Sequence, residues 1–345
     1  MFVYVIRRIL LVIPTFIGVT VLVFIITRFV PNSSIYFSPD KSQMGGIQGI
    51  QETGSGTFTS FHTIETNRLN DFFAFEKPWY SAYFHWLSKI IAGDFGKSLK
   101  YGDSVLDIIK PRVRITLLFG LLALGITYAI SIPLGIKKAL LHGSIFDNVS
   151  SIIFFILYAL PSYLAAIILF SIFSARLGWF PLGGFQSTDI IRSSMNGIQK
   201  IFDTLHHIFL PLTAYSINSL AAISITMKNM LLENISAEYV KAAVAKGRTF
   251  KDAVYHHAVK NSLIPIASEF GTMVTSFISG TFVIEQIFNI RGMGMLGYSA
   301  LHDRDYPVVM GVLAITVLIS LLGNILSDII VSVLDPQIRF GRSYA

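Results

Sequence analysis

Six long apolar stretches mark this 345-residue chain. A helix needs about 20 apolar residues to cross a hydrocarbon core about 30 Å thick, and each stretch reaches that length. They lie near residues 9–30, 115–136, 149–174, 209–231, 263–288 and 306–331. The pattern predicts an all-α integral membrane protein with six spanning helices and both termini on one side of the membrane.

Proline positions refine this prediction. Pro211, Pro265 and Pro307 fall near predicted helix starts, where a missing N–H costs little. Three others fall inside or near the ends of predicted spans: Pro14, Pro133 and Pro161. We expect these three to bend their helices, which membrane bundles tolerate when neighbours satisfy the freed carbonyls.

The apolar pattern divides the chain into three parts. Residues 1–30 hold the N-terminus and first span, 31–113 form a long extracytoplasmic loop, and 114–345 form the core with a cytoplasmic loop at 232–262. Residues 42–60 are rich in Gly, Ser and Thr, which predicts a mobile segment. The structure of residues 36–60 stays open at this stage.

The second half of the long loop has a different composition. From residue 72 to 109 it is aromatic and amphipathic. We expect short helices on the outer face of the bundle, with Trp79 and Trp86 at the level of the membrane interface.

Charge supports the membrane assignment and sets an orientation. Charged residues make up 14% of the chain, against about 25% in soluble domains. The formal net charge is +7, and basic residues gather at four places: Arg7–Arg8, Lys137–Lys138, residues 241–260 and Arg339–Arg342. All four fall on one side of a six-span topology, which the positive-inside rule assigns to the cytosol. No recognised nucleic-acid-binding module is present, so nucleic acid is not a predicted partner.

The cytosolic segment between the fourth and fifth spans predicts a helix–glycine–helix element. Ser236 is placed to cap a first helix of about ten residues, with Glu238 favoured by the helix dipole. Gly247 is placed to end that helix in a left-handed conformation. Thr249 and Asp252 resemble a capping box, so a second short helix should run to the edge of the fifth span.

One face of the first short helix consists of small apolar residues. Val240, Ala243, Val244 and Gly247 follow i, i+3, i+4, i+7 spacing, with basic residues around them. Such a face suits a shallow knob gripped by a groove of another protein. A plain cytosolic connector explains the same pattern, and both interpretations stay open on this evidence.

Several motifs in a shared order carry a family resemblance. They are IRRILLVIP, EKPWYSAYFHWL, GDFGKSL, PLGI, LGWFPLGG, HIFLPL, EYVKAAVAKG, KNSLIP, EQIFNIRGMGML, DRDYPVV and LDPQIRF. The chain resembles the first-type (B) permease of ABC importers in the dipeptide, oligopeptide and nickel family, over nearly its whole length. The stretches around residues 31–60 and 288–308 are most similar to the Yej-type subfamily, which imports peptides and microcin-type antibiotics.

The resemblance implies a type I importer permease fold and a set of partners. These are a second homologous permease in a heterodimer, two ABC ATPase subunits, an extracytoplasmic substrate-binding protein and membrane lipid. The cytoplasmic loop would then contact an ATPase, with these residues as candidates: Glu238, Tyr239, Ala242, Ala243, Lys246, Gly247, Arg248 and His257. Val259-Lys260 stand where a shorter form of the motif has Leu-Pro, which leaves the limits of the coupling helix open. The resemblance implies a transport subunit without cofactor, metal or catalytic residue, placed in the cytoplasmic membrane.

Two sequence patterns mimic other chemistries. AGDFGKS lacks the first glycine of a phosphate loop, because Ile91 occupies that position. The pairs His206-His207 and His256-His257 point about 100° apart on a helix and lack an acidic cluster, so we predict no metal site there.

Ionisable residues inside predicted spans are functional candidates. Glu269 and Glu285 are candidates for the translocation path, whereas Asp328 is interpreted as a partner of another helix. Nickel or another small solute remains an alternative cargo, and an ion-coupled secondary transporter is an alternative class. The absence of an obvious internal repeat argues against the latter, and no catalytic set suggests an intramembrane enzyme.

Overall fold

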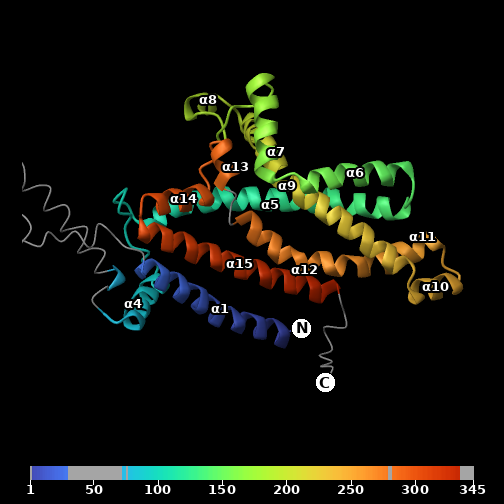
Figure 1. Ribbon diagram of the computed structural model, residues 1–345, viewed down its shortest axis with the longest axis horizontal. Helices are drawn as coiled ribbons and strands as arrows, with labels where there is room; N and C mark the ends of the chain where they lie inside the picture. The colour runs from blue at the N-terminus through green and yellow to red at the C-terminus, as the bar shows by residue number, and fades with distance from the viewer. Residues whose placement is uncertain (1, 30–71, 75–76, 279–281, 335–345) are drawn as a thin grey trace, which may run out of the picture. The chain divides into compact units, whose positions relative to one another are not determined.

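The computed structural model describes residues 2–29, 72–74, 77–278 and 282–334 (Figure 1). The described part is helical, apart from turns, loops and one isolated bridge between Lys97 and Ser104. The first elements are α1 (Phe2–Phe29), α4 (Trp79–Ile91), α5 (Val105–Leu140), α6 (Ile145–Ala159), α7 (Ser162–Leu169), the π-helical η2 (Phe170–Arg176) and α8 (Asp189–Ser193). The later ones are α9 (Gly197–Ile235), α10 (Glu238–Ala245), α11 (Phe250–Ala253), the π-helical η3 (Val254–Ala258), α12 (Val259–Ile278), α13 (Phe282–Ile287), α14 (Met293–His302) and α15 (Tyr306–Leu334).

Within the described residues, four helices are long and apolar enough to cross a membrane: α1, α5, α9 and α15. A fifth crossing results if α6 and the α7–η2 helix, bent by 100° at their junction, count as one broken span. The expected span at 263–288 is not among them. Within its sequence the structure describes α12, up to Ile278, and α13, from Phe282, and α12 carries Glu269 among several hydroxyl side chains that lower its apolar character.

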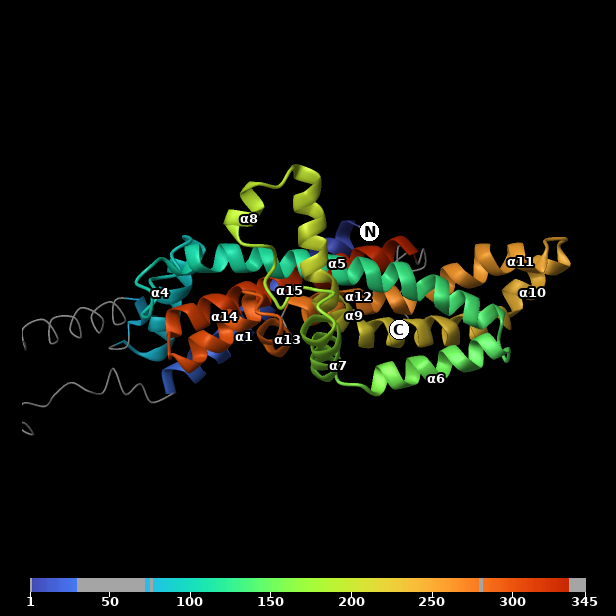
Figure 2. The ribbon, with the colours of Figure 1, turned by 90° about the horizontal axis from the view of Figure 1, so that it is seen from above.

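Helix starts differ from the sequence prediction at two prolines. α9 begins at Gly197 and α12 at Val259, so Pro211 and Pro265 lie inside their helices and not near the starts. Pro307 is the second residue of α15, as expected. The predicted bend at Pro161 is confirmed by the sharp corner between α6 and α7, which Figure 2 shows. α1 and α5, in contrast, continue as helices through Pro14 and Pro133.

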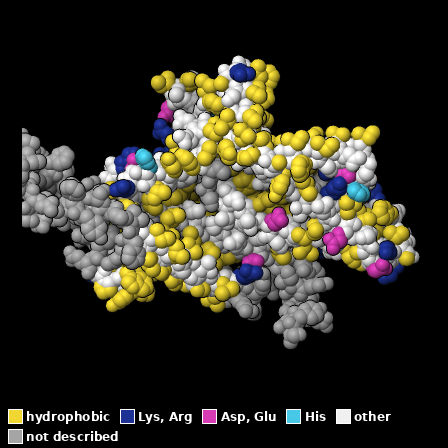
Figure 3. Space-filling view, viewed as in Figure 1, with side chains coloured by type: hydrophobic (Ala, Val, Ile, Leu, Met, Phe, Trp, Pro, Cys, Tyr) yellow, Lys and Arg dark blue, Asp and Glu magenta, His cyan; other side chains and the backbone are white. Residues whose placement is uncertain are grey.

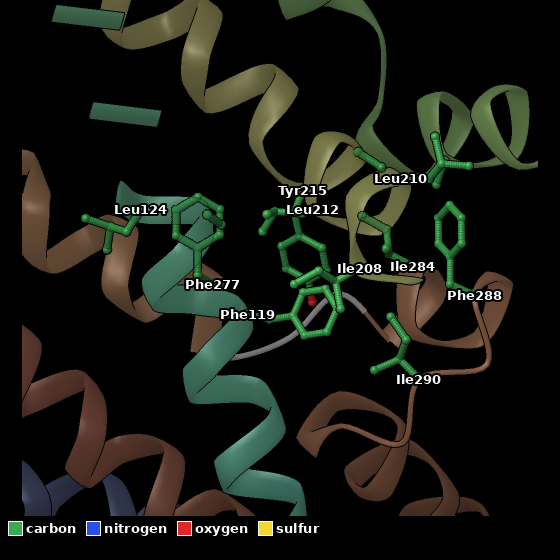
Figure 4. Packing of buried hydrophobic residues seen from close by; sticks show 13 residues of the cluster. Phe119, Leu124, Ile208, Leu210, Leu212, Tyr215, Phe277, Ile284, Phe288 and Ile290 are labelled. Carbon is green, nitrogen blue, oxygen red and sulfur yellow. The ribbon is translucent and has the colours of Figure 1, made fainter. Parts of the chain in front are cut away.

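The chain forms two compact units. The first consists of Met1–Ile13, Arg112–Leu296 and Thr316–Ala345. Its central cluster joins α5, α9, α12 and α13, with Phe119, Tyr215, Phe277 and Phe288 among its buried side chains (Figure 4). Because lipid is as apolar as these side chains, close packing and hydrogen bonds, more than exclusion of water, hold such helices together.

Ion pairing also joins helices of the first unit. Arg8 Nε on α1 lies 3.1 Å from Asp328 Oδ2 on α15. The interpretation of Asp328 as a partner of another helix is therefore confirmed.

The second unit consists of Pro14–Pro111 and Gly297–Ile315. Phe24 of α1 and Met310 of α15 pack with Phe73 and Trp86 in its core. Trp86 is fully buried in this core and Trp79 is half exposed. The level of these two side chains in the membrane stays a prediction. The predicted mobile segment 42–60 lies outside the described residues.

Candidate functional site

The cytosolic segment folds as predicted in outline, with different caps. α10 covers Glu238–Ala245, which is shorter than the ten residues expected. Its N-cap is Ala237, whereas Ser236 ends α9 and donates its hydroxyl hydrogen bond to the Glu233 carbonyl at 2.8 Å. Ser236 therefore serves the preceding helix and not α10.

The turn after α10 depends on a glycine. Gly247 has φ of +93°, and its N–H donates to the Val244 carbonyl at 2.9 Å. A side chain at this position would meet no atom of this chain within 4 Å. The predicted left-handed termination is confirmed, and its requirement for glycine is conformational, not steric within this chain.

The helix after this turn begins with the predicted cap. Thr249 Oγ1 accepts the Asp252 N–H at 3.2 Å, and Arg248 Nη1 lies 3.1 Å from Asp252 Oδ2. α11, η3 and α12 then follow without a break. His256 lies 2.8 Å from Asp252, while His257 is partly buried on the π-helical turn. π-helical turns occur frequently at functional sites.

α10 has an inward and an outward face. Val240 is 1% exposed and Ala243 is 9% exposed, and both pack with Met227, Leu231 and Val254. The prediction that this small apolar face is available to a partner is wrong for Val240 and Ala243, because the helix uses them to attach to its own scaffold. Ala139 of α5 belongs to the same cluster.

The outward face of this element carries most of the predicted contact residues. Those exposed are Glu238, Tyr239, Ala242, Lys246, Gly247 and Arg248. Lys241 Nζ donates to Glu238 Oε1 at 2.8 Å, and this bond holds the pKa of the Glu238 carboxyl below its ordinary value. Figure 3 shows charged side chains gathered where α10 and α11 lie, next to a largely apolar surface.

Polar contacts tie this element to its neighbouring helices. The Tyr239 hydroxyl donates to Asn234 Oδ1, and Asn234 Nδ2 donates to Ser262 Oγ at 3.2 Å. Beside the π-helical turn, a pocket of about 590 Å³ is lined by Tyr255, by residues at the end of α5 and by the first residue of the turn after it: Pro133, Ile136, Lys137, Leu140 and Leu141. The hydrogen bonds from Tyr239 to Asn234 and from Asn234 to Ser262 thus connect α10 with α9 and α12.

A buried ionic cluster lies where α5, α6 and α9 meet. Asp147 Oδ1 is 2.7 Å from Lys228 Nζ and 3.5 Å from Lys138 Nζ, with side-chain exposures of 2%, 14% and 1%. Lys138 Nζ also donates to Ser150 and Ser151 at 2.7 and 2.8 Å. The charge pattern placed Lys138 on the cytosolic side but gave no sign of its burial.

A second polar contact holds the corner between α6 and α7. Asn218 Nδ2 on α9 donates to the carbonyl of Leu160 at 2.8 Å and approaches those of Tyr158 and Leu157 at 3.2 and 3.3 Å. The Leu157 carbonyl lacks a helical donor because Pro161 has no N–H, and those of Tyr158 and Leu160 lie where α6 ends and the chain turns into α7. Asn218 thus holds the end of α6 on α9, and Lys228, through its ion pair with Asp147, holds the start of α6 on the same helix.

The two candidate carboxylates of the translocation path occupy different surroundings. Glu269 is exposed on α12. It shares one polar face with four other exposed residues, which the sequence analysis did not single out: Asn261, Ser268, Thr272 and Ser276. Their spacing follows the helical repeat, so the signal was present in the sequence.

Glu285 is buried and has a local structural partner. Glu285 Oε2 accepts the N–H of Met295 at 2.6 Å in the first turn of α14. A Cβ at Gly292 would lie 2.2 Å from Glu285 Oε1, so glycine permits this close approach. In the described part of the chain Glu269 and Glu285 share no hydrogen bond or ion pair, and Glu285 acts as a cap of α14.

The patterns that mimic other chemistries have local partners as well. Directly after GDFGKS, the N–H groups of Leu99 and Lys100 donate to Asp305, at 3.1 and 3.3 Å. His206 Nε2 pairs with the Trp179 carbonyl, and His207 Nδ1 pairs with the Asp203 carbonyl, each at 2.8 Å. The amides of the loop thus bind a carboxylate of this chain.

Comparison with known proteins places this architecture in a class. Residues 131–340 match the family described as "Binding-protein-dependent transport system inner membrane component". The chain belongs to this family of transport permeases, whose members are subunits of importers and not enzymes.

Full-length relatives narrow the comparison. The chain is 36% identical over 360 residues to the inner membrane ABC transporter permease protein YejB of Escherichia coli O157:H7, covering 98% of each chain. It is 34% identical over 361 residues to the peptidoglycan transport system permease protein YejB of Agrobacterium fabrum, again covering 98% of each. It is 32% identical over 340 residues to the oligopeptide transport system permease protein AppB of Bacillus subtilis, covering 98% of this chain and 99% of the relative.

Proposed function

We propose that this chain is the B-type permease of an ATP-driven importer of peptides or peptide-like substrates. It works with a second homologous permease, two ABC ATPase subunits and an extracytoplasmic binding protein. The observation that carries the proposal is the outward face of α10, presented on a helix whose opposite face is buried against the spanning helices. The family match and the names of the relatives supply the class and the cargo.

The coupling step begins at α10. An ATPase subunit binds α10 through Tyr239, Ala242 and Lys246. Because Val240 and Ala243 are packed in a core shared with α5 and α9, α10 cannot move independently of these two helices. Packed cores resist continuous deformation, so they transmit displacements. Movement of the short helix therefore displaces the cytosolic ends of both spanning helices.

The polar contacts of α6 extend this transmission. Lys228 ties the start of α6 to α9, and Asn218 ties its end to the same helix. α6 and α9 thus move together up to the corner at Pro161. ATP and loaded binding protein shift the equilibrium between inward-open and outward-open states through their different affinities for the two.

The translocation path in this proposal follows the polar face of α12. A row of exposed hydroxyl, amide and carboxylate groups is costly against lipid but favourable along a water-filled path. Glu269 gives this face a negative charge suited to the amino group of a peptide. Glu285, in contrast, acts on the path indirectly, by fixing the start of α14.

The proposed topology has six spans, with α12 as the fifth. Both termini and residues 232–262 then lie in the cytosol, and the loop 31–113 lies on the extracytoplasmic side. Neighbouring helices compensate for the polar character of α12, since its apolar side packs with α5 and α9.

Transport by the complete complex in proteoliposomes tests the proposal. Uptake of labelled di- and oligopeptides should require ATP, both ATPases and the loaded binding protein, whereas nickel chelates should not be taken up. Uptake of labelled muropeptides is measured separately in the same proteoliposomes. Uptake that follows an imposed proton gradient without ATP would contradict the proposed class, and uptake of nickel alone would contradict the proposed cargo.

A further inference from the structure

The helix α4 carries an outward aromatic face that the transport proposal does not use. Tyr80, Phe84, Ser88 and Ile91 are exposed and follow i, i+4, i+8, i+11 spacing, so they share one side. Trp79 is exposed beside Tyr80, with ring centroids 5.9 Å apart. The opposite side, with Ala82, Tyr83 and Trp86, is buried.

Contacts with α1 set the depth of α4. Tyr83 Oη lies 2.9 Å from Thr20 Oγ1, and the Tyr83 and Trp86 rings lie 5.7 and 5.9 Å from that of Phe24. Thr20 lies seven residues before Thr27, the end of the apolar window Leu10–Thr27. At 1.5 Å per residue, Thr20 is about 10 Å inside the apolar part of this span.

We propose that α4 is embedded in one leaflet of the bilayer and that lipid acyl chains cover its face of Tyr80, Phe84 and Ile91. In the proposed topology this is the outer leaflet. A helix held beside the apolar window of a span cannot lie wholly in the aqueous phase.

Continuity with α1 argues for lipid as the occupant. Only 11% of its apolar window is buried, and Leu22 and Ile26, on the same stretch as the contacts to α4, are 58% and 54% exposed. The helix α4 therefore packs on a stretch of α1 that itself presents apolar side chains requiring lipid. Trp79 and Tyr80, at the start of α4, are of the residue types enriched at the edge of the hydrocarbon region.

This placement of α4 determines how the segment after the first span sits in the membrane, which is separate from its part in transport. It also revises the expectation of helices resting on the outer face of the bundle. Residues 72–109 are not simply an extracytoplasmic loop if one of their helices occupies the depth of Thr20.

Spin labelling tests this placement, since the chain has no cysteine of its own. A nitroxide is attached at Phe84→Cys in the full chain, within the complete complex made free of other reactive cysteines and reconstituted in lipid. Leu22→Cys provides the lipid-facing control, and Asp94→Cys in the exposed loop after α4 provides the aqueous control. Collisions with oxygen and with a water-soluble nickel chelate are measured at each site.

The label at Phe84 should resemble that at Leu22, with oxygen collisions exceeding those of the nickel chelate. Collision rates like those at Asp94 would place α4 in water and overturn the proposal. An immobile label inaccessible to both reagents would show that a protein partner covers the face, which also overturns it. Each outcome is independent of whether the complex transports peptides.

Discussion

Lys228 on α9 and Asp147 on α6 form an ion pair, with 2.7 Å between Nζ and Oδ1. The pair is buried next to Lys138 and lies one residue from Met227, which packs in the same core as α10. The charge cluster is therefore one residue along α9 from the core that holds the proposed coupling helix. Its members are separated by up to 90 residues in sequence, and its loss has a defined thermodynamic consequence.

Asp147→Ala should destabilise the chain strongly, because it leaves the buried Lys138 and the largely buried Lys228 without their carboxylate. Breaking a buried pair in this way typically costs about 3–5 kcal/mol. The matched control is Asp107→Ala, which removes an exposed pair with Lys110 and should cost about 0–1 kcal/mol. Thermal unfolding of the purified chain in detergent measures both. Equal stability of the two variants would show that the cluster contributes nothing.

Asn218→Leu should weaken the corner between α6 and α7. The change leaves the Leu160 carbonyl without its donor at a point where helical N–H groups are missing, at a cost of about 1–3 kcal/mol. Thr213→Val is a suitable control, because Thr213 bonds within its own helix, to Phe209. Hydrogen exchange at the amides around residues 157–164 should increase in the Asn218 variant and stay unchanged in the control. No increase would mean that another group supports the corner.

Glu269 and Glu285 should respond differently to removal of their carboxylates. Glu269→Ala leaves stability near wild type, because its side chain is exposed, but should reduce peptide uptake. Glu285→Ala should lower the midpoint of thermal unfolding, because α14 loses the acceptor for its Met295 N–H. Unfolding and uptake are measured on the same preparations. A stable Glu285 variant, or full uptake by the Glu269 variant, would contradict the respective assignment.

Gly247→Val should uncouple ATP hydrolysis from uptake. A β-branched residue at φ +93° is strained by roughly 1–2 kcal/mol or more, so the end of α10 would be redirected. Gly247→Asn should be milder, since Asn tolerates positive φ, and Lys251→Gln serves as an exposed control. The variants should still insert in the membrane. If Gly247→Val shows wild-type peptide uptake and wild-type stimulated ATP hydrolysis, the turn at Gly247 is not required for coupling.

The sequence predicted local features of the coupling segment because they rest on short-range chemistry. Gly247 ends its helix and Thr249 caps the next one through contacts within three residues. The caps differ at Ser236, which bonds to the preceding turn. Hydroxyl groups satisfy either helix end, and sequence alone does not choose between them.

Contacts between distant helices were less predictable. Burial of Lys138 depends on Asp147, Ser150 and Ser151, which meet it only after the chain turns back at residues 141–144. The inward position of Ala243 depends similarly on α9 and η3. Small apolar residues at helical spacing are equally compatible with packing against the same chain and with docking to another. The structure distinguishes the two faces of α10, and this distinction permits the sharpest test.

Single cysteines at the neighbouring positions Ala242 and Ala243 test the central claim most directly. Ala242 is exposed and Ala243 is buried against the scaffold, although the two residues are adjacent and chemically identical. In the permease alone, Ala242→Cys should react rapidly with a thiol reagent and Ala243→Cys slowly. Addition of the ATPase subunits should protect Ala242→Cys and allow its crosslinking to the ATPase. If Ala242→Cys reacts equally fast with and without the ATPase subunits and forms no crosslink, α10 is a connector and the proposed coupling site is wrong.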